Sequence, residues 1–382
     1  MKRLRILITC EMLDRRGGSE LYVRDVALAM LRAGHAPVVY ASRPGAVAAE
    51  IRNLTVPVLN RLDDVSFAPD LVYGQHHLPT MAALLRFREA PAAYVCHDWY
   101  GQNAFAPRFP RLLRFVAVDE PCRDRLVYED GVEESRVRLL PNSVDLGRFG
   151  PRPPLPARPR RALAFGNYTH EGEHLAALRG ACARVGVELD VVGERMNNAV
   201  ARPEEVLKEY DVVFAKGRAA LEAVAVGAAV IVYSGLRFLG PLVRADEVER
   251  LLPLNFGVRV MGEELAPAEL AARAERELRR YDPEDAAKAS ALVRARAGHA
   301  AAMQAVLELC EEVVAEYEEV RGGLDPRLEG PAAAAYLERL GAHLDASRRG
   351  AEGSAAARLS SRLNRHPRAA RLIRRLGRVL LR

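Results

Sequence analysis

Two cations and a carboxylate gather in one short stretch of the second half of the sequence. Lys216, Gly217 and Arg218 directly follow an apolar run, and Glu222 lies about one helical turn further on. The run has the length of a buried strand. We therefore expect a helix to begin here, where backbone N–H groups and the helix dipole favour an anion. Lys216 and Arg218 suit phosphate groups, and Glu222 suits the hydroxyls of a ribose. The stretch predicts a site for a nucleotide diphosphate.

A pair of glycines near the N-terminus has a similar setting. Gly17 and Gly18 lie between an apolar run, 4–9, and a periodic helical segment, 21–31. Glycines at a strand-to-helix turn let backbone N–H groups approach a phosphate, although they also serve tight turns. The G-x-G-x-x-G fingerprint of dinucleotide-binding proteins does not occur in the chain, which argues against a nicotinamide enzyme.

Histidines lie at the ends of two further apolar runs. His97 and Asp98 close the run 92–97, and open α/β sheets bind ligands at the carboxyl ends of their strands. We take this pair as candidate catalytic residues, with a structural role as the alternative. His76 and His77 follow the run 71–74 and are candidates for lining the same site. Adjacent side chains point in different directions, so these two do not predict a metal site.

Metal and disulfide chemistry find no support in the sequence. His170 and His174 are four residues apart, as on one helix face, but no third ligand is evident. The five cysteines are scattered singly, without a C-x-x-C pair. The basic N-terminus precedes too short an apolar run for a signal peptide, and no run is long enough to span a membrane. We expect no metal, no cofactor and a cytoplasmic location.

The elements that would position these residues alternate along the first half of the chain. Short apolar runs are each followed by a helix-like segment, which is typical of buried parallel strands with crossover helices. The runs are 4–9, 37–41, 71–74, 92–97, 115–118 and 137–140. This pattern predicts an N-terminal α/β domain over residues 1–149.

Five prolines in the ten residues 150–159 interrupt the alternation, and residues 150–160 are predicted to be a linker. Strand-like runs then return at 161–165, 188–192, 211–215 and 229–233, and helical patterns follow over 266–320 with a break at Asp282-Pro283. We expect a second α/β domain over 161–322. Residues 323–382 are predicted to be a helical or partly disordered basic tail.

The positive charge of the chain is concentrated in that tail. The 382 residues carry a net charge of +6, yet residues 358–382 hold nine arginines and no acidic residue. The rest of the chain is slightly acidic, which argues against nucleic acid as a partner. The first interpretation of this segment is a poorly ordered basic tail. Arginines interleaved with Leu, Ile and Val give the sharper alternative, a basic amphipathic helix on an anionic membrane surface, and RNA or an acidic partner is the third.

Four motifs in order resemble the GT-B glycosyltransferases of the retaining family 4 type. They are 17–20 (GGSE), 96–99 (CHDW), 140–145 (LPNSVD) with Phe149, and 221–227 (LEAVAVG), and the resemblance covers about 320 residues. It implies two Rossmann-like domains facing each other across a cleft, with the acceptor held by the first and the nucleotide-sugar donor by the second.

Roles for individual residues follow from the same resemblance. Glu222 would bind the ribose, Gly17 and Gly18 would lie beside the donor phosphates, and His97 would lie near the sugar. His76 and His77 would line the acceptor side. The family transfers sugar with retention of configuration and without an obligatory metal ion. Positive groups would stabilise the departing nucleotide diphosphate.

The chain also departs from the family pattern at two places. A glutamate usually stands eight residues before the one at 222, where this chain has Phe214. The family's basic loop after the first strand of the second domain is replaced by Gly166-Asn167 and Glu171-Gly172. Lys216 and Arg218 would then supply the missing charge.

Together these observations predict a hexosyltransferase that uses a nucleotide diphosphate sugar and a glycan, lipid-linked or small-molecule acceptor. Two alternatives stay open: a nucleotide-sugar epimerase, and a protein of the same shape that has lost catalysis and serves as a scaffold. The sequence identifies neither the sugar, the base, the acceptor nor the oligomeric state.

Overall fold

The computed structural model describes residues 2–101 and 104–365, which fall into two compact units. The first unit holds the chain up to Pro107 together with Arg111–Gly323. The second holds Arg108–Pro110 together with the residues from Leu324 onward. The predicted boundaries between domains and linker are not tested by this division, because both predicted α/β domains lie within the first unit.

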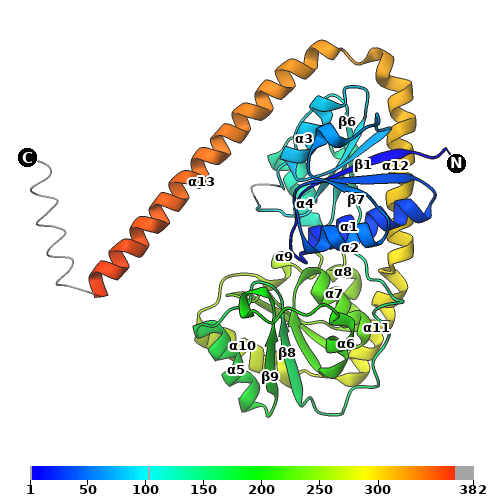
Figure 1. Cartoon of the computed structure of the whole chain (residues 1–382). Coiled ribbons are helices and arrows are strands. Elements are labelled where there is room, and N and C mark those ends of the chain that lie inside the picture. The colour runs from blue at the N-terminus through cyan, green and yellow to red at the C-terminus, as the bar shows by residue number, and fades with distance from the viewer. Residues whose placement is uncertain (1, 102–103, 366–382) are drawn as a thin grey trace, which may run out of the picture. The chain divides into compact units, whose positions relative to one another are not determined.

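The first half of the chain forms a parallel sheet (Figure 1). In the described residues it has seven strands in the order β3-β2-β1-β4-β5-β6-β7, all parallel to their neighbours. They are β1 Arg5–Leu13, β2 Ala36–Pro44, β3 Val58–Leu59, β4 Leu71–Gln75, β5 Ala92–Cys96, β6 Leu112–Ala117 and β7 Val137–Leu139. Each of the six predicted runs overlaps a strand, and only the two-residue β3 was missed.

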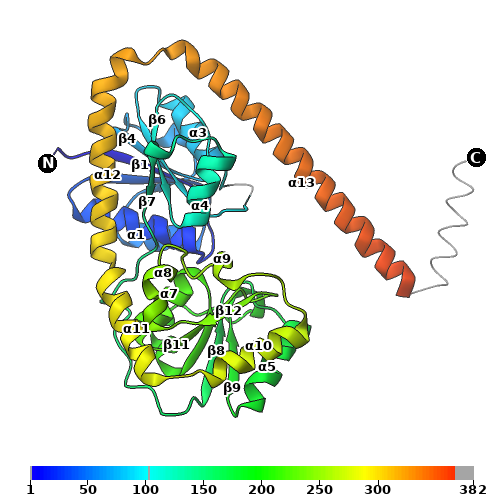
Figure 2. The same ribbon diagram turned by 180° about the vertical axis from the view of Figure 1, so that it is seen from behind.

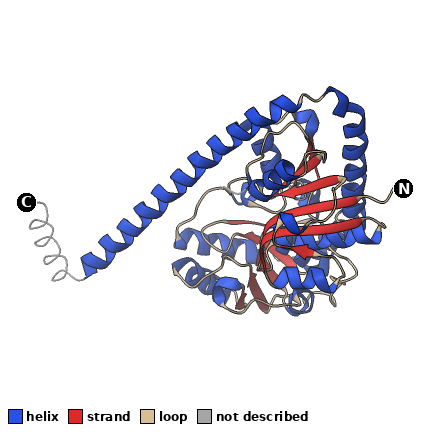
Figure 3. Cartoon of the chain, turned by 45° about the horizontal axis from the view of Figure 1, so that its top comes forward, coloured by secondary structure: helices blue, strands red, loops and turns tan. Residues whose placement is uncertain are grey.

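Helices lie on both sides of the strands (Figure 3). Those of the first half are α1 Gly18–Arg32, α2 Ala46–Asn53, α3 His77–Arg86 and α4 Glu120–Asp124. Both α1 and α3 begin just after strands of the sheet, so their N-termini lie at its carboxyl edge.

The second half forms a smaller sheet in the order β12-β11-β10-β8-β9. Its described strands are β8 Arg161–Phe165, β9 Glu188–Val192, β10 Val212–Ala215, β11 Ala229–Tyr233 and β12 Leu239–Leu242. The sequence predicted the first four, which are parallel. It missed β12, an antiparallel edge strand whose Pro241 is tolerated only because one side of the strand is unpaired. The prediction of two Rossmann-like α/β sheets is thus confirmed.

The helices of the second half include five that follow the sheet in sequence. The set is α5 Glu173–Arg184, α6 Pro203–Val206, α7 Gly217–Val226, α8 Val248–Leu251, α9 Val258–Met261, α10 Pro267–Arg279, α11 Pro283–Arg296 and α12 His299–Val320. Asp282 caps α11 as predicted, accepting hydrogen bonds from the N–H groups of Glu284 and Asp285. The long α12 crosses back to the first half, where it packs against α1, β4, β5 and β6 (Figures 1 and 2).

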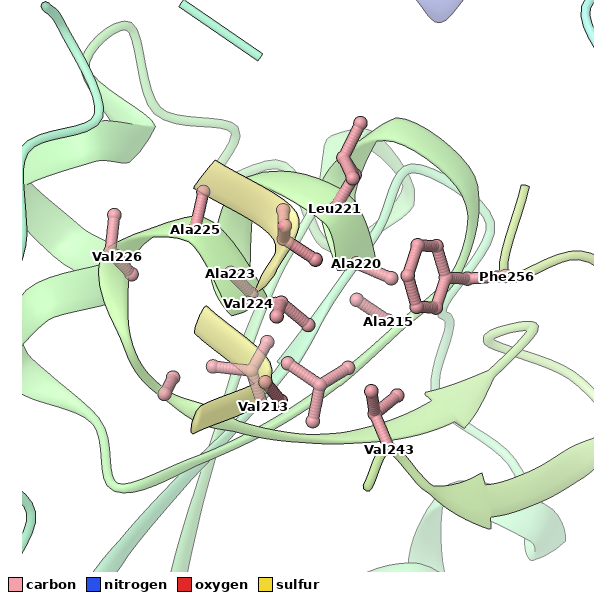
Figure 4. Close-up of a cluster of buried hydrophobic side chains, with 14 of the residues drawn as sticks. Val213, Ala215, Ala220, Leu221, Ala223, Val224, Ala225, Val226, Val243 and Phe256 are labelled. Atoms are coloured by element: carbon pink, nitrogen blue, oxygen red, sulfur yellow. The ribbon is translucent and has the colours of Figure 1, made fainter. Parts of the chain in front are cut away.

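A dry apolar cluster holds α7 against its sheet (Figure 4). Leu221 and Val224 of the helix and Val213 of β10 are almost completely buried in it, and Phe256 closes the end near the helix start. Because seven consecutive residues of α7 are buried, its N-terminus has little freedom to move. The helix thereby fixes where Lys216 and Arg218 lie.

The second unit contains α13 (Glu329–Arg365), preceded by a 3₁₀ turn at Pro326–Leu328. Among the described residues, no helix combines the length and apolar character needed to cross a bilayer. The amphipathic segment predicted within 358–382 lies mostly outside the described residues.

Candidate functional site

The N-terminus of α1 lies beside a buried carboxylate. Gly17 precedes the helix, and a Cβ atom at this position would collide with the carboxylate of Glu20. Ser19 Oγ donates a hydrogen bond of 2.9 Å to the same carboxylate, and burial raises its pKa. A Cβ at Gly18 would meet nothing within 4 Å. The open side for a phosphate is therefore at Gly18, while a side chain at position 17 would displace the carboxylate of Glu20.

His97 directly follows β5 and has polar neighbours. Its Nε2 atom is 2.7 Å from Oε1 of Gln75, and its ring meets the ring of Tyr22 edge-on at 4.9 Å. Burial, together with the neighbouring His76, lowers the pKa of His97 to about 3, so the imidazole is neutral at pH 7. A neutral imidazole can donate or accept a hydrogen bond but supplies no positive charge.

Asp98 does not act as the partner of His97. Its side chain is exposed and accepts a hydrogen bond of 2.9 Å from the N–H of Tyr100, which orders the turn after β5. Electrostatically it acts on Lys216, whose pKa it tends to raise. The sequence predicted both residues as catalytic, and this role stays a prediction; the structure shows a neutral imidazole and an exposed carboxylate that acts electrostatically on Lys216.

The two adjacent histidines have different surroundings, as expected. His76 has a left-handed backbone (φ 59°), and its Nδ1 accepts a hydrogen bond of 3.1 Å from the N–H of Glu11. His77 is stacked on Phe105 with ring centroids 3.8 Å apart. His76 acts electrostatically on His97, and the acceptor-side role of both histidines stays a prediction.

Lys216 is the N-cap residue of α7, and its ammonium lies above an aromatic ring. The Nζ atom is 5.2 Å from the centroid of Tyr168, and the guanidinium carbon of Arg195 is 5.8 Å from the same centroid. Burial lowers the pKa of Lys216, against the opposing effect of Asp98. In the part of the chain that the structure describes, the ammonium has no hydrogen bond or ion pair. The site thus holds a desolvated cation without a paired anion.

Arg218, in contrast, is fully engaged. Its Nε donates to Glu222 Oε1 at 2.9 Å, and its Nη2 donates to Asp25 Oδ2 of α1 at 2.8 Å. All three side chains are about nine-tenths buried. Burial disfavours the charge of Arg218, but Glu222 and Asp25 outweigh it and raise the pKa of the guanidinium. Arg218 therefore joins the two halves of the first unit, and its predicted contact with phosphate would require this bridge to open.

Glu222 is placed where the resemblance expects it, one turn into α7, but its carboxylate already holds Arg218. Burial raises its pKa, and Arg218 and Arg148 only partly oppose this. One oxygen is engaged by the guanidinium. Ribose binding by Glu222 stays a prediction, and it depends on the second carboxylate oxygen, Oε2.

The two departures from the family pattern do not point into this site. Phe214 is completely buried in β10 and meets Tyr233 edge-on, and Glu171 forms an exposed ion pair of 2.8 Å with Arg179. Asn167 reaches the first half instead, with its amide nitrogen 3.4 Å from the carbonyl oxygen of Arg16.

The loops of the two halves meet beside these residues. In addition to the Arg218–Asp25 pair, Glu120 N–H donates to the carbonyl of Pro253 at 2.9 Å, and Arg259 pairs with Asp124 at 2.7 Å. The structure thus brings the loop before α1, the turn after β5 and the start of α7 to one junction. His170 and His174 do not join it. The described residues contain no cluster of three or more His, Cys, Asp or Glu side chains that could hold a metal ion.

Three residues of the junction were missed from the sequence: Gln75, Asp25 and Tyr168. Asp25 lies 193 positions from its partner Arg218, so no spacing rule links them. Gln75 is a single polar residue at the end of an apolar run, which was the one available signal.

Comparisons with known proteins were made for the sequence and the fold. The sequence model of the family Glycosyltransferase Family 4 matches residues 16–148. No curated protein matches the chain. A glycosyltransferase from Rickettsia africae is similar in structure, with a TM-score of 0.61 and 15% identity over 82% of this chain and 99% of that one. Anabaena HepE, solved with UDP and glucose, has a TM-score of 0.57 and 15% identity over 81% of this chain and 100% of its own.

Removing the Arg218 cation tests the bridge between the halves. Arg218→Met leaves the buried carboxylate of Glu222 without its ion pair, while Asp25 keeps its ion pair of 2.7 Å with Arg24, and we expect the free energy of unfolding to fall by about 3–5 kcal/mol at pH 7. Urea unfolding measures it. Burial already raises the pKa of Glu222, and loss of the cation raises it further above the pKa of this group in the unfolded chain, so the deficit must shrink as the pH falls toward 5.

Arg179→Met is the matched control, because it breaks the exposed pair with Glu171 and should cost about 0–1 kcal/mol. Equal losses in the two variants, or a deficit that does not change with pH, would contradict the role assigned to Arg218.

Proposed function

Because residues 16–148 belong to glycosyltransferase family 4 and the chain has the GT-B fold, we propose that this glycosyltransferase uses a nucleotide diphosphate sugar held at the start of α7. The sugar, of hexose type, passes to a hydroxyl of a glycan, lipid-linked or small-molecule acceptor. The observation that carries the proposal is the unpaired, desolvated ammonium of Lys216.

The surroundings of Lys216 favour a diphosphate over a ligand with fewer anionic oxygens. The N–H of Gly217 donates to the carbonyl of Phe256 at 3.3 Å, whereas those of Arg218 and Ala219 have no partner in the described chain. Two free amides and an ammonium at the start of a ten-residue helix favour a group with several anionic oxygens. Tyr168, which is 54% exposed, offers a flat ring beside them.

In the reaction that we propose, the bond between the anomeric carbon and the diphosphate oxygen breaks. Negative charge grows on that oxygen, and Lys216 and the helix amides stabilise it. The acceptor oxygen forms the new bond to the anomeric carbon, and its proton passes to the departing diphosphate. His97, neutral and close to the same junction, would contact a sugar hydroxyl. Retention of configuration and independence from metal ions follow from the family resemblance alone.

Uridine diphosphate is the first nucleotide to test, because HepE was solved with UDP and glucose. That finding concerns HepE, and at 15% identity it supports the choice of probe rather than a conclusion on this chain.

Replacing Lys216 should weaken binding of the nucleotide. We expect Lys216→Ala to raise the Kd of the preferred nucleoside diphosphate about 10- to 100-fold, since a hydrogen bond to a charged group contributes about 1.5–3 kcal/mol. Titration calorimetry with UDP, GDP, ADP and dTDP measures it. Lys288→Ala, an exposed lysine on α11, is the control and should bind as the wild type does.

Two results would count against the proposal. Equal affinity of Lys216→Ala and wild type would remove Lys216 from the donor site. Absence of binding by every nucleotide to the wild type would favour the scaffold function.

We further propose that residues 358–382 bind an anionic membrane surface and that the protein encounters its acceptor there. The nine arginines of this segment support it, since each basic residue near such a surface contributes about 1 kcal/mol. A variant that ends at residue 357 should lose sedimentation with vesicles containing phosphatidylglycerol while it keeps nucleotide binding. Undiminished sedimentation of this variant, or equal sedimentation of the full chain with neutral vesicles, would contradict the proposal.

A further inference from the structure

Gln75 is a completely buried polar residue that faces the candidate sugar site through one neighbour. It is the last residue of β4, where its N–H donates to Thr9 Oγ1 at 3.3 Å. Its side-chain oxygen Oε1 is 2.7 Å from Nε2 of His97. A carbonyl oxygen can only accept, so the hydrogen of this bond belongs to His97 Nε2.

The other end of the Gln75 amide makes no hydrogen bond. Its Nε2 is among the buried side-chain atoms without a partner in the described chain. An unpaired buried donor lowers stability, and an apolar side chain of the same shape would avoid that loss. Packing therefore does not explain a glutamine at this position, whereas its bond to His97 does.

The surroundings hold the amide in place. Gly74 allows close approach of Thr80 of α3, because a Cβ at 74 would collide with that side chain. Thr80 Oγ1 in turn lies 3.1 Å from Thr9 Oγ1, which accepts the hydrogen bond of the Gln75 N–H. The end of β4 is thus fixed from both neighbouring elements, and Gln75 has a defined direction.

We propose that Gln75 is a positioning residue that holds the imidazole of His97 as its Nε2–H tautomer, leaving Nδ1 as a hydrogen-bond acceptor for a hydroxyl of the sugar or of the acceptor. The inference rests on the proposed function for the role of Nδ1. In the described residues, no hydrogen bond to Nδ1 is formed, so its lone pair is available. Tyr22 closes the edge of the ring and prevents it from turning.

The protonation of His97 is set by few groups. Tyr22 of α1 contacts the ring, His76 before α3 disfavours its charge, and Asp98 follows it in the chain and faces Lys216 instead. The neutral amide of Gln75 adds no charge to this set. A carboxylate in its place would stabilise the imidazolium and so convert the acceptor Nδ1 into a donor.

The tautomer can be measured without turnover. In long-range ¹H–¹⁵N spectra of the histidine side chains, protonated and unprotonated ring nitrogens have well-separated shifts, and His97→Asn identifies the His97 signals. We expect protonated Nε2 and unprotonated Nδ1 in the wild type at pH 7. Gln75→Met should give a mixture of tautomers. A ring protonated on Nδ1, or one unchanged in Gln75→Met, would overturn the inference.

Kinetics then separate positioning from structure. We expect Gln75→Met to lower kcat about 10- to 100-fold at every pH, with unchanged nucleotide affinity, since the donor phosphates lie at α7. Gln75→Glu should raise the pKa of His97, so its activity is lost as the pH falls through that value and returns toward wild type at pH 9. A parallel pH profile for the two variants would overturn the proposal.

Thr80→Ser is the matched control. It keeps the hydroxyl that bonds to Thr9 and His76 and removes only a buried methyl group, so it should lower thermal stability and leave the tautomer and the pH profile unchanged. Failure of the proposed function is distinguishable, because it appears as no transfer by the wild type, whatever the His97 spectrum shows.

Discussion

The ion pair bridge of Arg218 is the interaction on which the arrangement of the junction depends. One guanidinium, about nine-tenths buried, holds Glu222 on its own helix and Asp25 on α1 of the other half. A charge removed from water in this way is tolerated only because both partners are in hydrogen-bond contact. The bridge sets the distance between the N-termini of α1 and α7, the two helix ends to which the candidate donor residues belong.

Because of this bridge, Arg218 and Lys216 have different roles. Arg218 has its charge satisfied within the protein, whereas Lys216, two residues earlier, lies above the ring of Tyr168 and has no hydrogen bond or ion pair among the described residues. A ligand with negative charge therefore gains most at Lys216. The neutral state of His97 fits the same division, because the positive charge is supplied at α7 and the imidazole is left to make hydrogen bonds.

The sequence predicted the strands and helices well, but it did not predict which elements and side chains contact each other. The strands β8, β9 and β11 were predicted with their observed bounds. The completely buried β11 shows the reason most clearly, because a strand buried on both faces reads as a continuous apolar run. The crossing of α12 back to the first sheet was not predicted, since an amphipathic pattern does not reveal which sheet it covers. The sequence could not assign separate roles to the two cations of the site either, because their partners Asp25 and Tyr168 lie far away in the chain. Arg218 and Lys216 look alike in sequence, and only the position of Asp25 distinguishes them.

The most direct test of this account is a crystal structure of the protein with its preferred nucleoside diphosphate. We predict that phosphate oxygens lie within hydrogen-bond distance of Lys216 Nζ and of the first free amides of α7, with Arg218 still bound to Asp25 and Glu222. A diphosphate bound away from Lys216, or an Arg218 that leaves its two carboxylates to bind it, would contradict the division between the two cations.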